Sequence, residues 1–212
     1  AKAEEEGKED LTAEEDAVSA LEDQLDGLDD SINDARDALQ NTVAHPLMDV
    51  WFKDEQKGFA VGAFGELIKT VDGGVTWESI NRFIDNPDRN HLNAITGLGD
   101  TLFIAGEAGR IYKSSDAGAS WRLLESPDPE NGSFFAVNLL DDKQVMIVGL
   151  RGAIYRSNDQ GDTWKQVDEP LHKNMNAVRF AGNDVLLLVG NDGAFLRSRD
   201  VGRTFEAHIQ GD

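Results

Sequence analysis

The sequence predicts an all-β fold, and three observations carry this prediction. Short apolar or alternating segments recur along residues 46–212, separated by turns rich in Gly, Asp and Asn. One turn pattern, Ser/Thr-x-Asp-x-Gly-x-Thr/Ser-aromatic, occurs four times, with its aspartates 44, 43 and 41 residues apart. Each copy follows a Gly-x-x-Gly sequence and a pair of apolar residues. Repetition at this period indicates one supersecondary unit used four times.

Every position of the repeated turn has a mechanical reason. The aspartate can accept hydrogen bonds from backbone N–H groups beyond it, and the glycine can adopt a positive φ. The aromatic ring is large enough to pack against a neighbouring sheet. We therefore interpret these residues as structural rather than catalytic or metal-binding. They are Asp72, Gly74, Trp77, Asp116, Gly118, Trp121, Asp159, Gly161, Trp164, Asp200, Gly202 and Phe205.

Four short strands per repeat are typical of a β-propeller blade. In the first repeat they are expected at 47–52, 58–62, 66–70 and 76–80. The four predicted blades cover about 46–80, 91–125, 133–168 and 174–208. We favour the interpretation that they form part of a larger propeller, and a closed four-bladed ring is the alternative.

The N-terminal segment has a different character. Residues 1–45 contain 15 Asp or Glu but only 3 Lys or Arg. We expect an acidic tail at 1–11 and an amphipathic, heptad-like helix at 12–41, with Thr12 and Glu15 as a capping box. The apolar stripe of this helix would dock on the protein's own propeller or on a partner. It consists of Val18, Leu21, Leu25, Leu28, Ile32, Ala35 and Leu39.

Composition excludes several classes of function. The chain has no cysteine, so disulfides, zinc–thiolate sites and thiol catalysis are ruled out. A formal net charge of -20 over 212 residues argues against nucleic acid as a partner, because phosphate binding depends on Lys and Arg. No apolar run approaches the roughly 20 residues that span a bilayer. The chain begins with Ala and contains no signal peptide, so we expect it to be a processed or excised piece.

The turn pattern resembles the Asp-box, also called the bacterial neuraminidase (BNR) repeat. The longer pattern of residues 148–164, "VGLRGAIYRSNDQGDTW", is similar to that of the photosystem II stability/assembly factor family, and especially of its relatives in non-photosynthetic bacteria. This resemblance covers about 46–212 and departs from the usual Trp only at Phe205. It implies a binding partner that is a membrane protein or complex, and an exported location in the periplasm or thylakoid lumen. Asp-box propellers also include glycoside hydrolases and sorting receptors.

Residues that differ between the repeats are the candidates for function, because scaffold requirements are common to all copies. Ligands of propellers tend to bind where the loops into the inner strand meet the loops between the second and third strands. These loops supply the predicted binding rim. Its residues are Phe64, Glu107, Arg151, Asp192, His91 and His172.

No catalytic set emerges from the sequence. A sialidase needs a tyrosine nucleophile, but Tyr112 and Tyr155 occupy a position that holds Ile68 and Leu196 in the other repeats, which indicates packing. His45, His91 and His172 precede successive inner strands in inconsistent register, so a three-histidine metal site is disfavoured. We therefore predict no catalytic residue, no metal and no cofactor.

The sequence therefore favours a non-enzymatic scaffold that binds a protein partner and assists the assembly or stability of a membrane complex. The alternative is a carbohydrate-active Asp-box protein, either a glycoside hydrolase or a lectin. Several exposed aromatic residues on the rim would favour that alternative.

Overall fold

A computed structural model describes residues 18, 25, 27–28, 45–129 and 132–209 of the chain. The chain divides into two units, Ala1–Ala44 and His45–Asp212. In the first unit, Val18, Leu25, Gly27 and Leu28 have helical backbone. The remainder of the predicted helix at 12–41 and the predicted tail at 1–11 lie outside the described residues.

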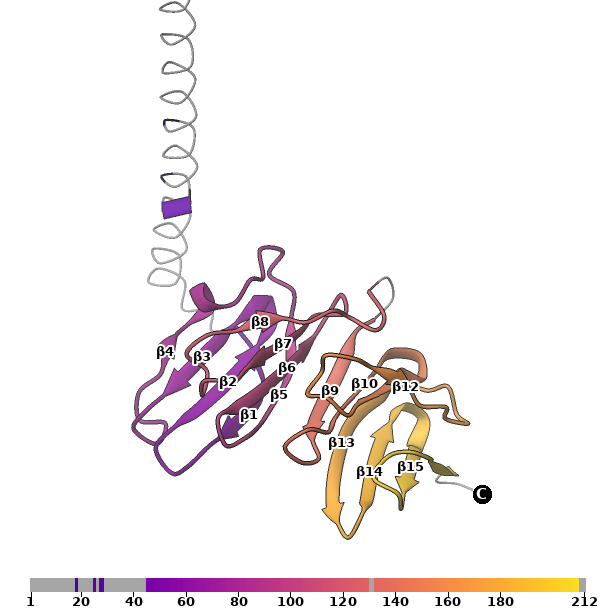
Figure 1. The fold of residues 1–212 in the computed structure, drawn as a ribbon. Helices are drawn as coiled ribbons and strands as arrows, with labels where there is room; N and C mark the ends of the chain where they lie inside the picture. The colour runs from indigo at the N-terminus through magenta and orange to yellow at the C-terminus, as the bar shows by residue number, and fades with distance from the viewer. Residues whose placement is uncertain (1–17, 19–24, 26, 29–44, 130–131, 210–212) are drawn as a thin grey trace, which may run out of the picture. The chain divides into compact units, whose positions relative to one another are not determined.

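The second unit contains four four-stranded sheets, which follow one another in chain order (Figure 1). The first sheet consists of β1 (Leu47–Phe52), β2 (Gly58–Gly62), β3 (Leu67–Thr70) and β4 (Glu78–Ser79). The second consists of β5 (Leu92–Leu98), β6 (Thr101–Gly106), β7 (Ile111–Ser114) and β8 (Arg122–Leu123). The third consists of β9 (Phe134–Leu139), β10 (Val145–Gly149), β11 (Ile154–Ser157) and β12 (Lys165–Gln166). The fourth consists of β13 (Met175–Gly182), β14 (Val185–Gly190), β15 (Ala194–Ser198) and β16 (Glu206–Ile209).

Each sheet is an antiparallel meander in which sequential strands are neighbours. The pairing of the first and second strands begins alike in all four sheets. The first residue of the first (inner) strand lies opposite a glycine at the end of the second strand, and a register shift follows. These glycines are Gly62, Gly106, Gly149 and Gly190. One sheet of this kind has too little core to be stable alone, so it must pack on another. The predicted all-β fold of Asp-box propeller blades is confirmed.

The apolar core lies between successive sheets. Alternate residues of a strand point to opposite faces of its sheet, so the second and third sheets each present one apolar face to each of their two neighbouring sheets. Between the first and second sheets, Phe59 and Val61 pack with Leu102, Ile104 and the buried ring of Tyr112. Equivalent clusters join the second sheet to the third and the third to the fourth.

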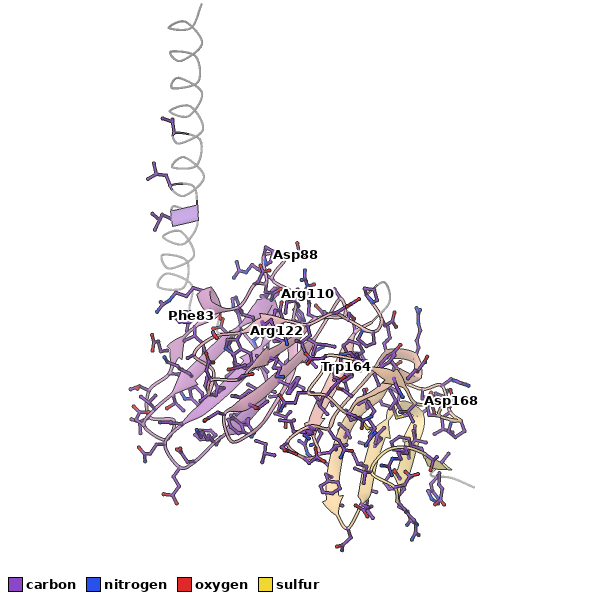
Figure 2. All side chains as sticks on the ribbon, in the orientation of Figure 1. Phe83, Asp88, Arg110, Arg122, Trp164 and Asp168 are labelled. Carbon is purple, nitrogen blue, oxygen red and sulfur yellow. The ribbon has the colours of Figure 1, made fainter. Side chains whose placement is uncertain are left out.

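The aromatic residue of each later Asp-box packs toward the preceding sheet. Trp121 lies against the cluster of the first and second sheets, and Trp164 lies against the next cluster (Figure 2). Phe205 has the same place against the third cluster. Trp77 has no preceding sheet in the structure, and its ring meets Phe52 of its own sheet edge-on, with the centroids 6.0 Å apart. Of the three clusters among the described residues, none joins the first sheet to the fourth, so these residues do not form the closed four-bladed ring.

The Asp-box turns are closed by a repeated set of side-chain hydrogen bonds. In the second sheet the Ser114 hydroxyl donates to Asp116 Oδ1 at 2.8 Å and accepts the Gly118 N–H at 2.9 Å. Asp116 also accepts the Ser120 N–H at 2.9 Å and the Ser120 hydroxyl at 2.6 Å. The same bonds occur around Asp72, Asp159 and Asp200.

These bonds stabilise the charged form of the carboxylates. The hydroxyl and then the N–H of Ser120 lower the pKa of Asp116 to about 2. Thr76 and Thr163 lower the pKa of Asp72 and of Asp159 to about 2 in the same way. At Asp200, burial acts to raise the pKa, but bonds from Ser198 and Thr204 outweigh it and the pKa is again about 2.

Two features of these turns were not assigned from the sequence. The Ser or Thr two residues before the aspartate, such as Ser114, is the acceptor for the buried glycine N–H. The residue after the aspartate adopts a positive φ even when it has a side chain, as in Ala117 (57°), Gln160 (59°) and Val201 (58°). The expected positive φ of the glycine itself is present, at 81° in Gly118.

Candidate functional site

The residues of the predicted rim lie where the loop between the second and third strands of each sheet meets the segment that leads into the first, inner strand of the same sheet. In all four sheets, the N–H after the first glycine of Gly-x-x-Gly donates to a carbonyl of that segment. The bonds are 2.9 to 3.0 Å long and run from the N–H of Ala63 to the carbonyl of Pro46, from Glu107 to His91, from Leu150 to Ser133 and from Asn191 to Asn174. A Cβ on Gly106 would clash with the His91 carbonyl, and the other three glycines face the same restriction. The glycine therefore permits the contact that forms the rim.

The second x of each Gly-x-x-Gly has a left-handed backbone. Phe64, Arg151 and Asp192 have a φ of 56°, and Ala108 has a φ of 50°. Three of these loops are the 3-10 turns η1 (Ala63–Gly65), η3 (Leu150–Gly152) and η4 (Asn191–Gly193). Glu107, expected on the rim beside Phe64, is not its equivalent: Ala108 occupies that position and Glu107 precedes it.

Phe64 lies between two histidines of the rim. Its ring centroid is 5.2 Å from that of His45 and 5.1 Å from that of His91. Each imidazole has a carboxylate beside its Nδ1 atom: Glu66 at 3.2 Å from His45, and Glu107 at 3.6 Å from His91. Glu107 also accepts the His91 N–H at 3.1 Å. Phe64 is 50% exposed, so this cluster presents an apolar ring to solvent within a polar frame.

The rim of the third and fourth sheets is charged instead. The Arg151 N–H donates to Asn174 Oδ1 at 2.8 Å, and its exposed guanidinium has no hydrogen bond or ion pair among the described residues. Lys173 donates to Asp192 at 2.8 Å. His172 is exposed and lies 3.7 Å from the buried Glu169. Arg151 is thus the cation of this rim that is available to a ligand.

The rest of the rim is closed by local contacts. Arg110, next to the second Gly-x-x-Gly, donates to Asp88 of the loop before β5 at 3.2 Å (Figure 2). That loop includes the 3-10 turn η2 (Asn81–Phe83), where the Arg82 guanidinium lies 4.6 Å from the centre of the Phe83 ring. Of these two contacts, the Arg110–Asp88 bond connects the loop to the second Gly-x-x-Gly.

The two tyrosines lie in the sheets. Tyr112 is buried and donates to the Asp85 carbonyl at 2.9 Å, and burial raises its pKa to about 12. Burial also raises the pKa of Tyr155. Within the described ranges, no three His, Asp or Glu side chains gather in a manner that could hold a metal ion. In the same residues, no helix is long and apolar enough to cross a membrane.

Comparison with protein families adds to this geometry. A family model described as photosynthesis system II assembly factor YCF48 matches residues 31–181. The chain belongs to the YCF48 family. Photosystem II assembly lipoprotein Ycf48 of Synechococcus sp. (strain CC9902) is 39% identical over 85 residues, which are 39% of this chain and 25% of that protein.

Two solved YCF48 structures are similar to this chain. YCF48 bound to D1 peptide is 26% identical with a TM-score of 0.67, over 78% of this chain and 55% of that one. YCF48 from Cyanidioschyzon merolae is 20% identical with a TM-score of 0.68, over 81% of this chain and 59% of that one. The chain therefore spans little more than half the length of these solved YCF48 proteins, and a quarter of the curated one.

In this YCF48-family chain, the sequence placed Phe64 and His91 on one rim, and the structure brings their rings together. Arg151 and Asp192 lie on equivalent loops, and His172 is three residues before β13. Three further residues of the rim were not predicted from the sequence: Asn174, Lys173 and Glu66. They bond to Arg151, Asp192 and His45, respectively. Their position just before an inner strand or after a Gly-x-x-Gly is the signal that would have found them.

Proposed function

We propose that this protein is a non-enzymatic scaffold that binds an extended segment of a protein partner on its rim, and thereby assists the assembly or stability of a membrane complex. The observation that carries this proposal is the presence, on equivalent loops with the same left-handed backbone, of an exposed apolar ring, Phe64, and of a cation, Arg151, whose guanidinium has no partner among the described residues. An extended peptide can be held by an apolar side chain that anchors it and by a charged side chain that fixes its direction.

Family membership supports the same proposal. A YCF48 protein in this family has been solved with D1 peptide bound, and the Synechococcus relative is a lipoprotein. We infer an exported location for this protein, in the periplasm or thylakoid lumen, where the rim would meet exposed segments of a membrane protein. The N-terminal unit would provide a second contact with the partner or would dock on the propeller.

The test is a binding measurement with a labelled D1 peptide, by fluorescence polarisation on the whole chain. We expect Arg151→Glu to weaken binding about tenfold or more, because a charge-assisted bond becomes a repulsion. Phe64→Ala should weaken binding by the loss of its apolar contact. Lys165→Glu is the matched control. It makes the same charge change on β12, where Lys165 pairs with Arg156 in the part of β11 that leads into the Asp-box turn, away from the loop of Arg151. Equal affinity of Arg151→Glu and Lys165→Glu would contradict the proposed rim.

The carbohydrate-active alternative makes a different prediction. A glycan array and chromogenic glycosides would show binding or turnover by the native chain, and Phe64→Ala would reduce it. Among the described residues, Phe64 and Phe83 are exposed rings that this alternative could use. Of the Asp-box indoles only Trp77 is exposed, because Trp121 and Trp164 pack against the core.

A further inference from the structure

Each of the three loops that lead from one sheet to the next contains a polar residue followed by proline. These pairs are Asn86-Pro87, Ser126-Pro127 and Glu169-Pro170. The polar side chain lies against the second glycine of the Gly-x-x-Gly in the sheet before the loop. A Cβ on that glycine would come within 2.2 to 2.6 Å of a polar atom of the side chain, at Gly65, Gly109 and Gly152 alike. The polar residue therefore closes the loop on the rim.

The first and third of these loops have equivalent positions. Asn86 and Glu169 each lie six residues before the first residue of an inner strand. Three residues after them, Arg89 and His172 adopt a left-handed backbone, with φ of 52° and 50°. Glu169 and His172 therefore occupy the positions that Asn86 and Arg89 fill in the first loop.

The two loops differ in how the polar side chain is bonded. The Asn86 amide donates to the Asn90 carbonyl at 2.9 Å and accepts the Asn90 N–H at 3.1 Å, so both ends of the amide are bonded. Glu169 Oε2 accepts the Leu171 N–H at 2.6 Å, but Oε1 is buried and accepts no hydrogen bond among the described residues. A buried oxygen without a donor is unfavourable, above all in a charged group. Glu169 Oε1 therefore needs a donor that Asn86 does not need.

His172 is placed to supply this donor. Its Nδ1 atom lies 3.7 Å from Glu169 Oε1, a little beyond hydrogen-bond distance. The His172 side chain is 84% exposed and the Glu169 side chain is 1% exposed, so the imidazole can take a proton from water and turn toward the buried carboxylate. An imidazolium donates from both ring nitrogens, whereas a neutral imidazole donates from one.

The other charged groups around His172 come from its own loop and from the two rim loops beside it. Lys173 of the same loop is paired with Asp192 of η4 at 2.8 Å, so these two charges offset one another. The Arg151 guanidinium of η3 acts against a second positive charge on this rim. The buried Glu169, at 3.7 Å, favours that charge.

We propose that Glu169 and His172 form a pH-dependent latch on the rim, which closes when the His172 imidazolium donates from Nδ1 to Glu169 Oε1. The proton has this partner only in the closed loop. Acid therefore favours the closed loop, and the latch opens as the pH rises from about 5 to about 8, the range in which histidine loses its charge.

The latch acts on the rim through the two residues that follow His172. Asn174 Oδ1 accepts the Arg151 N–H at 2.8 Å, and Lys173 donates to Asp192. Closing the loop therefore fixes the Arg151 and Asp192 loops before a partner arrives, which lowers the cost of binding. This effect on the partner rests on the proposed function, whereas the latch itself does not.

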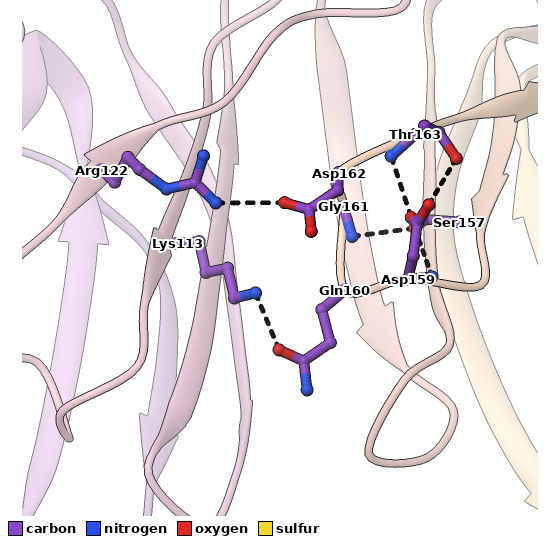
Figure 3. Close-up of polar contacts among 8 residues, drawn as sticks. All are labelled: Lys113, Arg122, Ser157, Asp159, Gln160, Gly161, Asp162 and Thr163. Atoms are coloured by element: carbon purple, nitrogen blue, oxygen red, sulfur yellow. Dashed lines mark hydrogen bonds and ion pairs between the residues drawn. The ribbon is translucent and has the colours of Figure 1, made fainter.

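Hydrogen exchange of backbone amides tests the latch without a partner. The amides of Leu171 and Arg151 are compared at about pH 5.5 and about pH 8, after correction for the intrinsic pH dependence of exchange. The internal reference is the Gly161 amide of the same sheet, which donates to Ser157 Oγ at 2.8 Å in the Asp-box turn (Figure 3). We expect the protection of Leu171 and Arg151 to be about threefold or more higher in acid, with Gly161 unchanged. If Leu171 and Arg151 change no more than Gly161, the latch is overturned.

Two substitutions distinguish the latch from a purely structural contact. His172→Phe keeps a ring without its nitrogens, and Phe64 adopts the same backbone, with a φ of 56°. Glu169→Gln keeps the acceptor for the Leu171 N–H and removes the charge that attracts the proton. Both should lose the pH dependence, whereas His208→Phe, at an exposed histidine of β16, is the matched control and should retain it. A native pH dependence in His172→Phe would overturn the latch, and the native profile decides the matter if circular dichroism shows that a variant is unfolded.

Affinity for the labelled D1 peptide tests the effect on the rim. By fluorescence polarisation, we expect the ratio of the dissociation constants at pH 8 and pH 5.5 to be about two- to threefold larger in the native chain than in His172→Phe. This comparison cancels any contribution of His45 and His91, which both chains share. Equal ratios would overturn the effect of the latch on the rim. A peptide that binds at neither pH would contradict the proposed function, while amide exchange would still decide the latch.

Discussion

The indole of Trp121 meets the ring of Phe59 edge-on across the interface of the first two sheets, with the centroids 6.3 Å apart and the planes at 81°. This contact joins the Asp-box of one blade to the second strand of the blade before it. The edge of one ring therefore faces the π-cloud of the other, which is a favourable arrangement for aromatic pairs.

We expect Trp121→Ala to lower the free energy of unfolding by about 3 kcal/mol, because a large ring is removed from a packed interface. Trp77→Ala is the matched control, since Trp77 has the same place in its Asp-box but lacks a preceding sheet. Its expected cost is below about 1.5 kcal/mol. Urea unfolding followed by fluorescence measures both values. Equal costs would show that the interface contact is not what stabilises Trp121.

The Ser114 hydroxyl should contribute more than its size indicates. In Ser114→Ala the buried N–H of Gly118 loses its acceptor, and we expect a loss of about 1–3 kcal/mol. Ser120→Ala removes a hydroxyl from the same turn at an exposed position, where water can replace it, so the cost should be below about 1 kcal/mol. Chemical denaturation of the two variants gives the comparison. A larger loss for Ser120→Ala would contradict this account.

The stability of the propeller should decrease in acid. The four Asp-box carboxyls have folded-state pKa values of about 2, below the value of about 4 in an unfolded chain. Protonation therefore favours the unfolded chain, and the stabilisation is fully present above pH 4 and is lost as the pH falls toward 2. Urea midpoints measured between roughly pH 6 and pH 2 test this. Asp116→Asn should lower the midpoint at neutral pH and flatten its dependence on pH.

Gly106 should tolerate no side chain. In Gly106→Ala the new Cβ would clash with the His91 carbonyl, and we expect a cost of about 2 kcal/mol or more. Gly99→Ala is the control, because Gly99 has a φ of 61° but no atom near its Cβ position, so only backbone strain of about 1 kcal/mol applies. Hydrogen exchange at the Glu107 amide should accelerate in the first variant alone, since that amide bonds to the His91 carbonyl.

Strand positions could be predicted where an apolar segment is bounded by glycines. Strands β1 and β2 begin and end where the apolar pattern and the flanking glycines place them. The fourth strand was expected over 76–80 but covers only Glu78–Ser79. Thr76 donates its N–H and hydroxyl to Asp72, so the turn extends into the expected strand.

The sequence predicts on which loops the candidate site residues lie, but not which hydrogen bonds and ion pairs they make. Loop equivalence placed Phe64, Arg151 and Asp192 on one edge, because each follows the same glycine. The partners of these residues come from segments of different length and composition before each inner strand. The repeats locate the place just before each inner strand, but Asn174 and Lys173 differ from the residues at the corresponding places, so the repeats do not predict the contacts that these two residues make.

The left-handed rim position has a consequence for how such proteins diversify. Phenylalanine, alanine, arginine and aspartate all adopt nearly the same torsion there, with φ between 50° and 56°. The backbone at each site thus accepts apolar, small, cationic and anionic groups alike, held at one angle. Side chains of different chemistry can therefore be placed at four equivalent positions on one backbone shape, which makes these positions a natural starting point for a combinatorial library.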